Sequence, residues 1–128
     1  MTTEVDADGP LGLRIRTFGL VLKGELAQTR WLQFLSEVAL AIGMNAVGEP
    51  AVWTYPVNGK GGVGQTIVLP ITESFLALDT WPDHDGAYLL VCSCRPFSPT
   101  DIVTVADLFD LETSHDDDKR FRAELNLK

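Results

Sequence analysis

The chain has 128 residues, which is the length of one ordinary domain. Hydrophobic residues make up 45% of it and charged residues 22%, a composition that favours a packed core and excludes disorder of the bulk. Ten basic against 18 acidic residues give a net charge of −8, which repels phosphate groups and argues against nucleic acid as a partner.

The N-terminal segment, the lengths of the apolar runs and the two cysteines predict the cellular compartment of the protein. Residues 1–10 are polar and acidic and end in Gly9-Pro10, so we expect a flexible leader before a single domain over residues 11–128. No apolar run approaches the roughly 18–20 residues that span a bilayer, and the leader carries acids where a secretory signal carries bases. Cys92 and Cys94 are too few for a disulfide framework. These features predict a cytoplasmic protein with reduced thiols and no membrane segment.

The first half of the chain predicts a strand, a helix and a second strand. Residues 13–22 are rich in β-formers, and a break in their alternation near Thr17 predicts a bulge. Residues 27–42 carry apolar side chains at helical spacing and end at a glycine. A further strand is expected over residues 47–55, and the four glycines of residues 58–64 predict a loop.

The middle of the chain predicts a β-hairpin. Strands are expected over residues 66–71 and 75–81, and Pro70 requires an edge position or a bulge because it has no N–H to donate. Residues 82–86 are dense in turn formers, and residues 87–94 return as a strand. The sequence therefore predicts a hairpin with a five-residue loop, centred on position 84.

The rest of the chain completes the fold class. Residues 98–101 carry capping residues that predict a helix over 102–108, and residues 121–127 alternate as a closing strand. The resulting order, β-α-β-β-β-β-α-β, has too few helices for a doubly wound sheet. We therefore predict an α+β fold, an antiparallel-rich sheet with two helices packed on one face. The other face needs cover, which predicts a homodimer.

Two local patterns imitate binding motifs. The segment from Lys60 to Thr66 is glycine-rich like a phosphate-binding loop, but Gln65 stands where a lysine is needed and no helix follows, so a hairpin connection is the better interpretation. His84 and His115 lie beside aspartates in hydrophilic turns, where neighbouring side chains rarely converge on one ion. We therefore expect no metal site.

The predicted hairpin brings a hydroxyl and a thiol together. If its loop centres on position 84, residues whose numbers sum to 168 lie opposite each other, so Ser74 faces Cys94 beside the carboxylate of Glu73. Two interpretations follow from this placement. Ser74 could end a strand next to a small buried cysteine, or the two side chains could form a reactive pair.

The same residues resemble a known family. The stretch from Glu73 to Asp83, ESFLALDTWPD, resembles the Glu-Ser-His-x-x-x-His-Thr-Trp-Pro-Glu segment of prokaryotic S-adenosylmethionine decarboxylases, and the spacing to Cys94 agrees. The glycine-rich loop, the first helix and the order of elements extend the likeness to roughly residues 12–109. The resemblance implies the two-layer α+β sandwich of that family.

The resemblance also implies self-cleavage. In that family the serine hydroxyl attacks the carbonyl of the preceding glutamate, the resulting ester eliminates, and the serine becomes a pyruvoyl group, which accepts the electrons released as carbon dioxide leaves the substrate. Mapped here, Ser74 is the pyruvoyl precursor, Glu73 ends the first chain, and Cys94 reprotonates the substrate carbon. Trp81, which could stack on an aromatic base, and Thr66 are the candidate substrate-binding residues.

The chain departs from the motif at both histidines. Phe75 replaces the first, and Asp79 replaces the second, which assists processing in the family. An ionised carboxylate cannot donate a proton, and a regular strand places Asp79 on the face opposite Ser74. Two functions therefore stay open. One is pyruvoyl-dependent decarboxylation of an amino-acid-derived amine in polyamine-type metabolism. The other is an unprocessed, non-catalytic homologue that acts as a small-molecule-binding or partner-subunit module.

Overall fold

A computed structural model describes residues 14–56, 63–114, 116 and 119–126. The predicted leader, Lys60 with most of the glycine-rich loop, and His115 lie outside the described residues. The elements, in chain order, are β2 (Arg14–Lys23), α1 (Gln28–Ala41), β3 (Ala51–Pro56), β4 (Val63–Ile71), β5 (Ser74–Trp81), the 3-10 turn η1 (Pro82–His84), β6 (Gly86–Ser93), α2 (Pro99–Leu108) and β7 (Arg120–Asn126).

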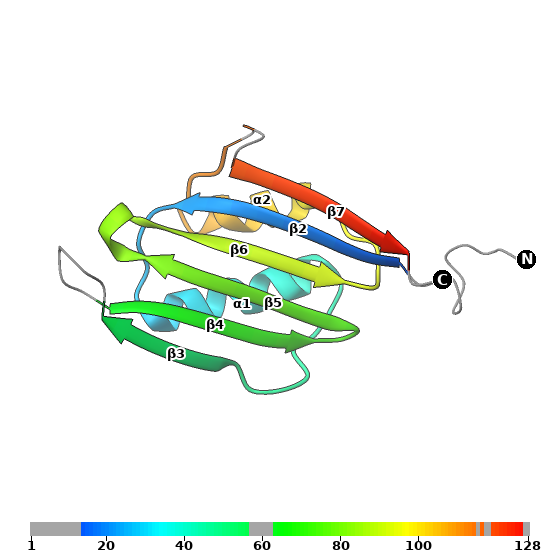
Figure 1. Ribbon diagram of the computed structural model, residues 1–128, viewed down its shortest axis with the longest axis horizontal. Helices are drawn as coiled ribbons and strands as arrows, with labels where there is room; N and C mark the ends of the chain where they lie inside the picture. The colour runs from blue at the N-terminus through cyan, green and yellow to red at the C-terminus, as the bar shows by residue number, and fades with distance from the viewer. Residues whose placement is uncertain (1–13, 57–62, 115, 117–118, 127–128) are drawn as a thin grey trace, which may run out of the picture.

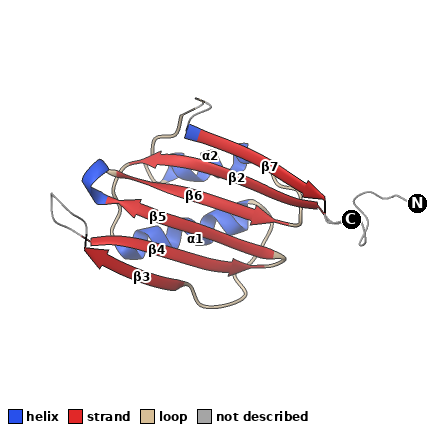
Figure 2. Ribbon diagram, viewed as in Figure 1, coloured by secondary structure: helices blue, strands red, loops and turns tan. Residues whose placement is uncertain are grey.

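The strands form one six-stranded sheet in the order β3-β4-β5-β6-β2-β7, in which every neighbouring pair is antiparallel. In Figure 1 the sheet faces the viewer and both helices lie behind it, and Figure 2 shows the same two layers by type of element. The predicted α+β class, with two helices on one face, is therefore confirmed. Among the described residues, no helix has the length and apolar character needed to span a bilayer.

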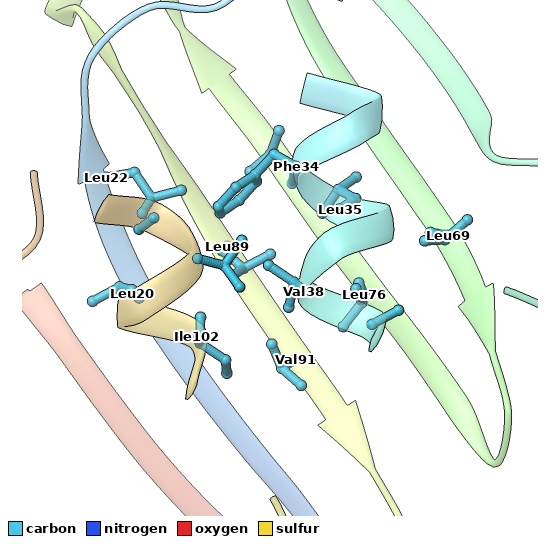
Figure 3. Close-up of a cluster of buried hydrophobic side chains, with 14 of the residues drawn as sticks. Leu20, Leu22, Phe34, Leu35, Val38, Leu69, Leu76, Leu89, Val91 and Ile102 are labelled. Carbon is cyan, nitrogen blue, oxygen red and sulfur yellow. The ribbon is translucent and has the colours of Figure 1, made fainter. Parts of the chain in front are cut away.

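The core lies between the sheet and the helices. Each strand turns alternate side chains to this face, and the helices contribute an apolar stripe to it. Figure 3 shows leucines and valines of the sheet meeting Phe34, Leu35 and Val38 of α1 and Ile102 of α2. The opposite side of the sheet, which we call the open face, is covered by neither helix (Figure 1).

The bulge predicted in the first strand is absent. β2 pairs with β6 without interruption from Arg16, opposite Ser93, to Lys23, opposite Gly86. The break in alternation has another cause. Near its start the strand turns Arg16 rather than an apolar side chain to the helix side, and this guanidinium donates to the carbonyl of Cys94 at 3.0 Å. Further along, Phe18 begins the buried series.

Pro70 lies neither on an edge strand nor at a bulge, so this prediction was wrong. It belongs to β4, the second strand of the sheet, and pairs with Phe75 in regular register. The ladder between β3 and β4 ends at the pair of Ala51 and Val68, before it reaches the proline. Beyond that pair the Pro70 carbonyl accepts from the N–H of Val47 at 3.0 Å. The missing donor therefore falls where the neighbouring strand has already ended.

Candidate functional site

The hairpin of β5 and β6 exists, but its register differs from the prediction by one residue. Trp81 pairs with Gly86 across a four-residue connection that ends in Asp85 with φ of 51°. Ser74 therefore lies opposite Ser93 rather than Cys94. Because a shift of one residue changes which side chains share a face, the predicted contact of hydroxyl and thiol does not form.

Ser74 belongs to the helix side of the sheet. Its cross-strand partner Ser93 is fully buried there, and the Ser93 hydroxyl is occupied by the backbone of Arg95, whose N–H donates to it at 2.9 Å. Within the described part of the chain, no hydrogen bond joins the Ser74 hydroxyl to any group. By strand alternation, Cys94 falls on the open face with Cys92. The two proposed reactive groups thus lie on opposite sides of the sheet.

The peptide bond before Ser74 has one feature that favours cleavage. Glu73 adopts a left-handed conformation with φ of 65°, and its carbonyl accepts a hydrogen bond from the N–H of Cys94 at 3.3 Å. This donor would polarise the carbonyl that the serine hydroxyl attacks. The Glu73 carboxylate points instead toward Arg95, 3.7 Å away, in a pair that is half exposed and worth little to stability.

Self-cleavage also requires a group that removes the hydroxyl proton and returns it. Asp79 lies five residues along the strand from Ser74, or roughly 16 Å at the rise of a β-strand, and on the other face. His84 lies at the far end of the hairpin. The surroundings of Ser74 among the described residues therefore supply a donor to the carbonyl, but no acid or base is hydrogen-bonded to the hydroxyl, because the Glu73 carboxylate is directed to Arg95. This arrangement does not fit formation of a pyruvoyl group.

The open face carries a hydrogen-bonded carboxylate that the sequence did not predict as a network. One oxygen of Asp79, Oδ1, accepts from the hydroxyl of Tyr55 at 3.1 Å and from that of Thr66, and Oδ2 accepts from the hydroxyl of Tyr88 at 2.9 Å. Tyr55, Thr66, Asp79 and Tyr88 come from four consecutive strands, β3 to β6. We call these four residues the Asp79 network.

The network changes the acidity of both tyrosines. The hydrogen bond to Asp79, followed by burial, raises the pKa of Tyr88 above its usual value. Burial is the main cause that raises the pKa of Tyr55, with the charge and hydrogen bond of Asp79 adding to it. Both phenols are therefore neutral donors at physiological pH, and they hold their protons toward the carboxylate.

A pocket of about 300 Å³ adjoins the network on the open face. Trp81 and Tyr88 are among its walls, and the Trp81 ring lies 6.3 Å from that of His84. Two lysines also line it, of which Lys23 donates to the His84 carbonyl at 3.1 Å. The structure thus brings Trp81 and Thr66, the predicted substrate-binding residues, to the same face as Asp79 and away from Ser74.

No metal centre was expected, and the described residues hold no group of three or more histidine, cysteine, aspartate or glutamate side chains that could bind an ion.

The sequence model of the S-adenosylmethionine decarboxylase family matches residues 26–114, which is more than half of the chain. The chain belongs to the S-adenosylmethionine decarboxylase family.

A solved structure supports the family fold. The chain is similar to the adenosylmethionine decarboxylase from Aquifex aeolicus VF5, with a TM-score of 0.53, 17% sequence identity and 88% of each chain covered. At this identity the likeness shows the fold alone. No curated protein matches the sequence.

Sequence reasoning missed Tyr55 and Tyr88 as members of the site in this family fold. Tyr88 is the cross-strand partner of Asp79, a pairing that the predicted register assigned to Leu89 instead. A predicted hairpin turn shorter by one residue would have paired Tyr88 with Asp79. Tyr55 is distant in sequence, and only the strand order β3-β4-β5 brings it within reach.

Proposed function

We propose that this member of the S-adenosylmethionine decarboxylase family remains uncleaved and binds a small molecule on the open face of its sheet. The placement of Ser74 carries the proposal. Its hydroxyl lies on the helix side, where no described acid or base forms a hydrogen bond with it, whereas Asp79, Thr66 and Trp81 gather on the other side. The groups that could recognise a ligand are thus separated from the bond that would have to break.

The open face has the properties of a binding surface. Trp81 and Tyr88 are each 44% exposed, beside a pocket large enough for a small organic molecule. Flat aromatic rings bind flat or apolar groups with little loss of side-chain freedom. The Asp79 network places one polar anchor beside these rings, which supplies orientation.

Pyruvoyl-dependent decarboxylation is the second candidate, and the hydrogen bond from Cys94 N–H to the Glu73 carbonyl favours it. In that case Ser74 would be the precursor of the pyruvoyl group and Glu73 the end of the first chain. Cys94 and Asp79 would be the remaining catalytic candidates. This function requires a rearrangement that brings a proton-transfer group to the Ser74 hydroxyl.

We also propose that two copies associate through the open face, which would place the proposed ligand site between the two copies. The exposed aromatic and aliphatic side chains of this face form the kind of apolar surface that marks protein–protein contacts. They come from four strands, and they are Trp53, Phe75, Trp81, Tyr88, Phe121 and Leu125. Covering them would remove apolar area from water at a gain of roughly 25 cal/mol per Å².

Intact-mass spectrometry of the purified full-length chain tests the main proposal. A single mass for the whole chain, unchanged over days at neutral pH, is the expected result. A Ser74→Ala variant is the matched control, because it cannot form the ester. Two fragments that divide between Glu73 and Ser74 in the natural chain, and not in the variant, would refute the proposal and establish the second candidate.

A further inference from the structure

The two edge strands of the sheet, β3 and β7, differ in how they meet a further strand. An edge strand presents unpaired N–H and C=O groups, which can pair with another chain. β3 follows Pro50 and ends in Pro56, and proline has no N–H to offer. β7 contains no proline, and it pairs with β2 in unbroken register along its whole length. Because no bulge turns it away, the outer side of β7, the outermost strand at the top of Figure 1, can accept a further strand.

The side chains of β7 alternate between charged and apolar. Arg122 pairs with the buried Phe18 of β2, so Arg122 and Glu124 lie on the helix side of the sheet, where both are exposed. Phe121 and Leu125 lie on the open face and are also exposed. A further strand at this edge would therefore meet one charged row and one apolar row.

The two charges of this row are little used within the chain. Oε1 of Glu124 lies 3.5 Å from Nη1 of Arg14, in an exposed pair of the kind that contributes little to stability. Arg122 forms no ion pair or hydrogen bond with the part of the chain that the structure describes. A strand that carries a carboxylate opposite Arg122 would supply the partner that this guanidinium lacks.

The sequence of β7 is complementary to itself. If a second copy of β7 runs antiparallel with Ala123 opposite Ala123, then Arg122 lies opposite Glu124 of the second copy, and Phe121 lies opposite Leu125. Opposite charges and aromatic–aliphatic pairs stabilise such cross-strand positions. If the centre moves by one residue, either Arg122 or Glu124 lies opposite itself, and like charges directly opposite are destabilising. The charge pattern therefore favours one register over its two neighbours.

We propose that β7 pairs with β7 of a second copy, in the antiparallel register centred on Ala123, so that the sheet continues from one copy into the next. The twofold symmetry gives each ion pair and each apolar pair twice, which a strand of another protein would not supply. The contact lies at the side of the sheet and leaves the open face to a different copy. It does not rest on the proposed function. A contact of this length is smaller than the roughly 1,200 Å² of stable interfaces, so it forms in concentrated solution.

Sedimentation equilibrium of the full-length chain at neutral pH, from about 10 µM to about 1 mM, tests the inference. We expect the average mass to double over this range. Arg122→Glu and Glu124→Arg each place like charges opposite one another, so each should need a concentration about tenfold higher or more. An equimolar mixture of the two variants should associate like the natural chain, because every glutamate then meets an arginine. Glu37→Arg, the same charge reversal on an exposed position of α1, should have no effect.

Three results would overturn the inference. They are a natural chain whose mass does not rise, an Arg122→Glu variant that associates as the natural chain does, and a mixture of the two folded variants that does not associate. If circular dichroism shows that either charge variant is unfolded, Ala123→Cys decides. Mild oxidation at high concentration should link its copies in pairs, and linkage no greater than in the natural chain or in Leu108→Cys on α2 refutes the register. If association through the open face fails instead, the doubling begins from the single chain, so the two proposals fail separately.

Discussion

The contact between Gly64 and Tyr55 offers a way to disturb the Asp79 network without removing any polar group. The Tyr55 ring lies over the glycine, so a Cβ added at position 64 would stand 2.5 Å from Tyr55 Cε2 and 2.9 Å from Cζ. Carbon atoms pack at about 3.5–4.0 Å, so in Gly64→Ala the ring must retreat by roughly 1 Å. Its hydroxyl, now 3.1 Å from Asp79 Oδ1, would then leave hydrogen-bond range.

The magnitude follows from three terms. Overpacking costs about 1–3 kcal/mol, with the lower end expected because Tyr55 lies on the edge strand β3 and can move. A hydrogen bond to a charged acceptor adds about 1.5–3 kcal/mol, and replacing glycine by alanine returns roughly 0.4–1 kcal/mol through the unfolded chain. We expect Gly64→Ala to lower the free energy of unfolding by about 2–4 kcal/mol.

Urea unfolding followed by tryptophan fluorescence measures the effect in two backgrounds. In Tyr55→Ala the obstructing ring is gone, so Gly64→Ala should cost nothing or stabilise slightly there. Tyr55→Phe keeps the ring and removes the hydroxyl, which isolates the hydrogen-bond term. An equal cost of Gly64→Ala in the natural and Tyr55→Ala backgrounds would show that the ring contact is not the cause, and would refute the reasoning.

Four further outcomes are expected. Leu76→Ala, at a fully buried position of β5, should cost about 2–5 kcal/mol in urea unfolding with an unchanged m-value, and a cost below 1 kcal/mol would contradict the packing of α1 on the sheet. Because the pKa values of Tyr55 and Tyr88 are raised in the folded chain, the stability they contribute is present below their unfolded value of 10.0 and is lost as the pH rises above it. Asp79→Asn should flatten this alkaline loss, and an unaltered pH profile would count against the network. Light scattering should give twice the 14.0 kDa chain mass. Leu125→Glu on the open face should lower this measured mass, whereas the control Leu108→Glu on α2 should leave it unchanged. Asp79→His should leave the chain uncut while circular dichroism shows it folded, because position 79 lies on the face away from Ser74; cleavage would show that the two positions can meet.

Most of the fold could be predicted from local patterns. The apolar spacing of α1 and the strand periods are set by short-range geometry, so the order of elements and the single helical layer followed from the sequence. The hairpin register could not be fixed in the same way. The register depends on whether the turn holds four or five residues. In the structure, Asp85 adopts a left-handed conformation and closes a four-residue turn, and the presence of an aspartate does not by itself predict that conformation. One residue in the turn moved the partner of Ser74 from Cys94 to Ser93.

The candidate site, too, could be predicted only in part. Alternation along one strand was enough to predict that Asp79 and Ser74 lie on opposite faces, because a β-strand has a period of two. The partners of Asp79 were not accessible to this reasoning. Thr66 and Tyr55 reach it only through the pairing of β3, β4 and β5, and no local pattern specifies which strands become neighbours.

The two positions at which the sequence was expected to depart from the family motif fall on the same side of the molecule. Phe75 and Asp79 both occupy open-face positions of β5, whereas Ser74 lies on the helix side. Phenylalanine and aspartate at these positions therefore contribute apolar area and a carboxylate to the open face, whereas Ser74 lies on the helix side. A chain that had lost only its cleavage step would be free to vary at these positions in any direction. Here the aspartate instead accepts three hydroxyl hydrogen bonds from three other strands, an arrangement that requires complementary residues at each of them. That complementarity is the physical reason to regard Asp79 as part of a binding surface rather than as a defective catalytic residue.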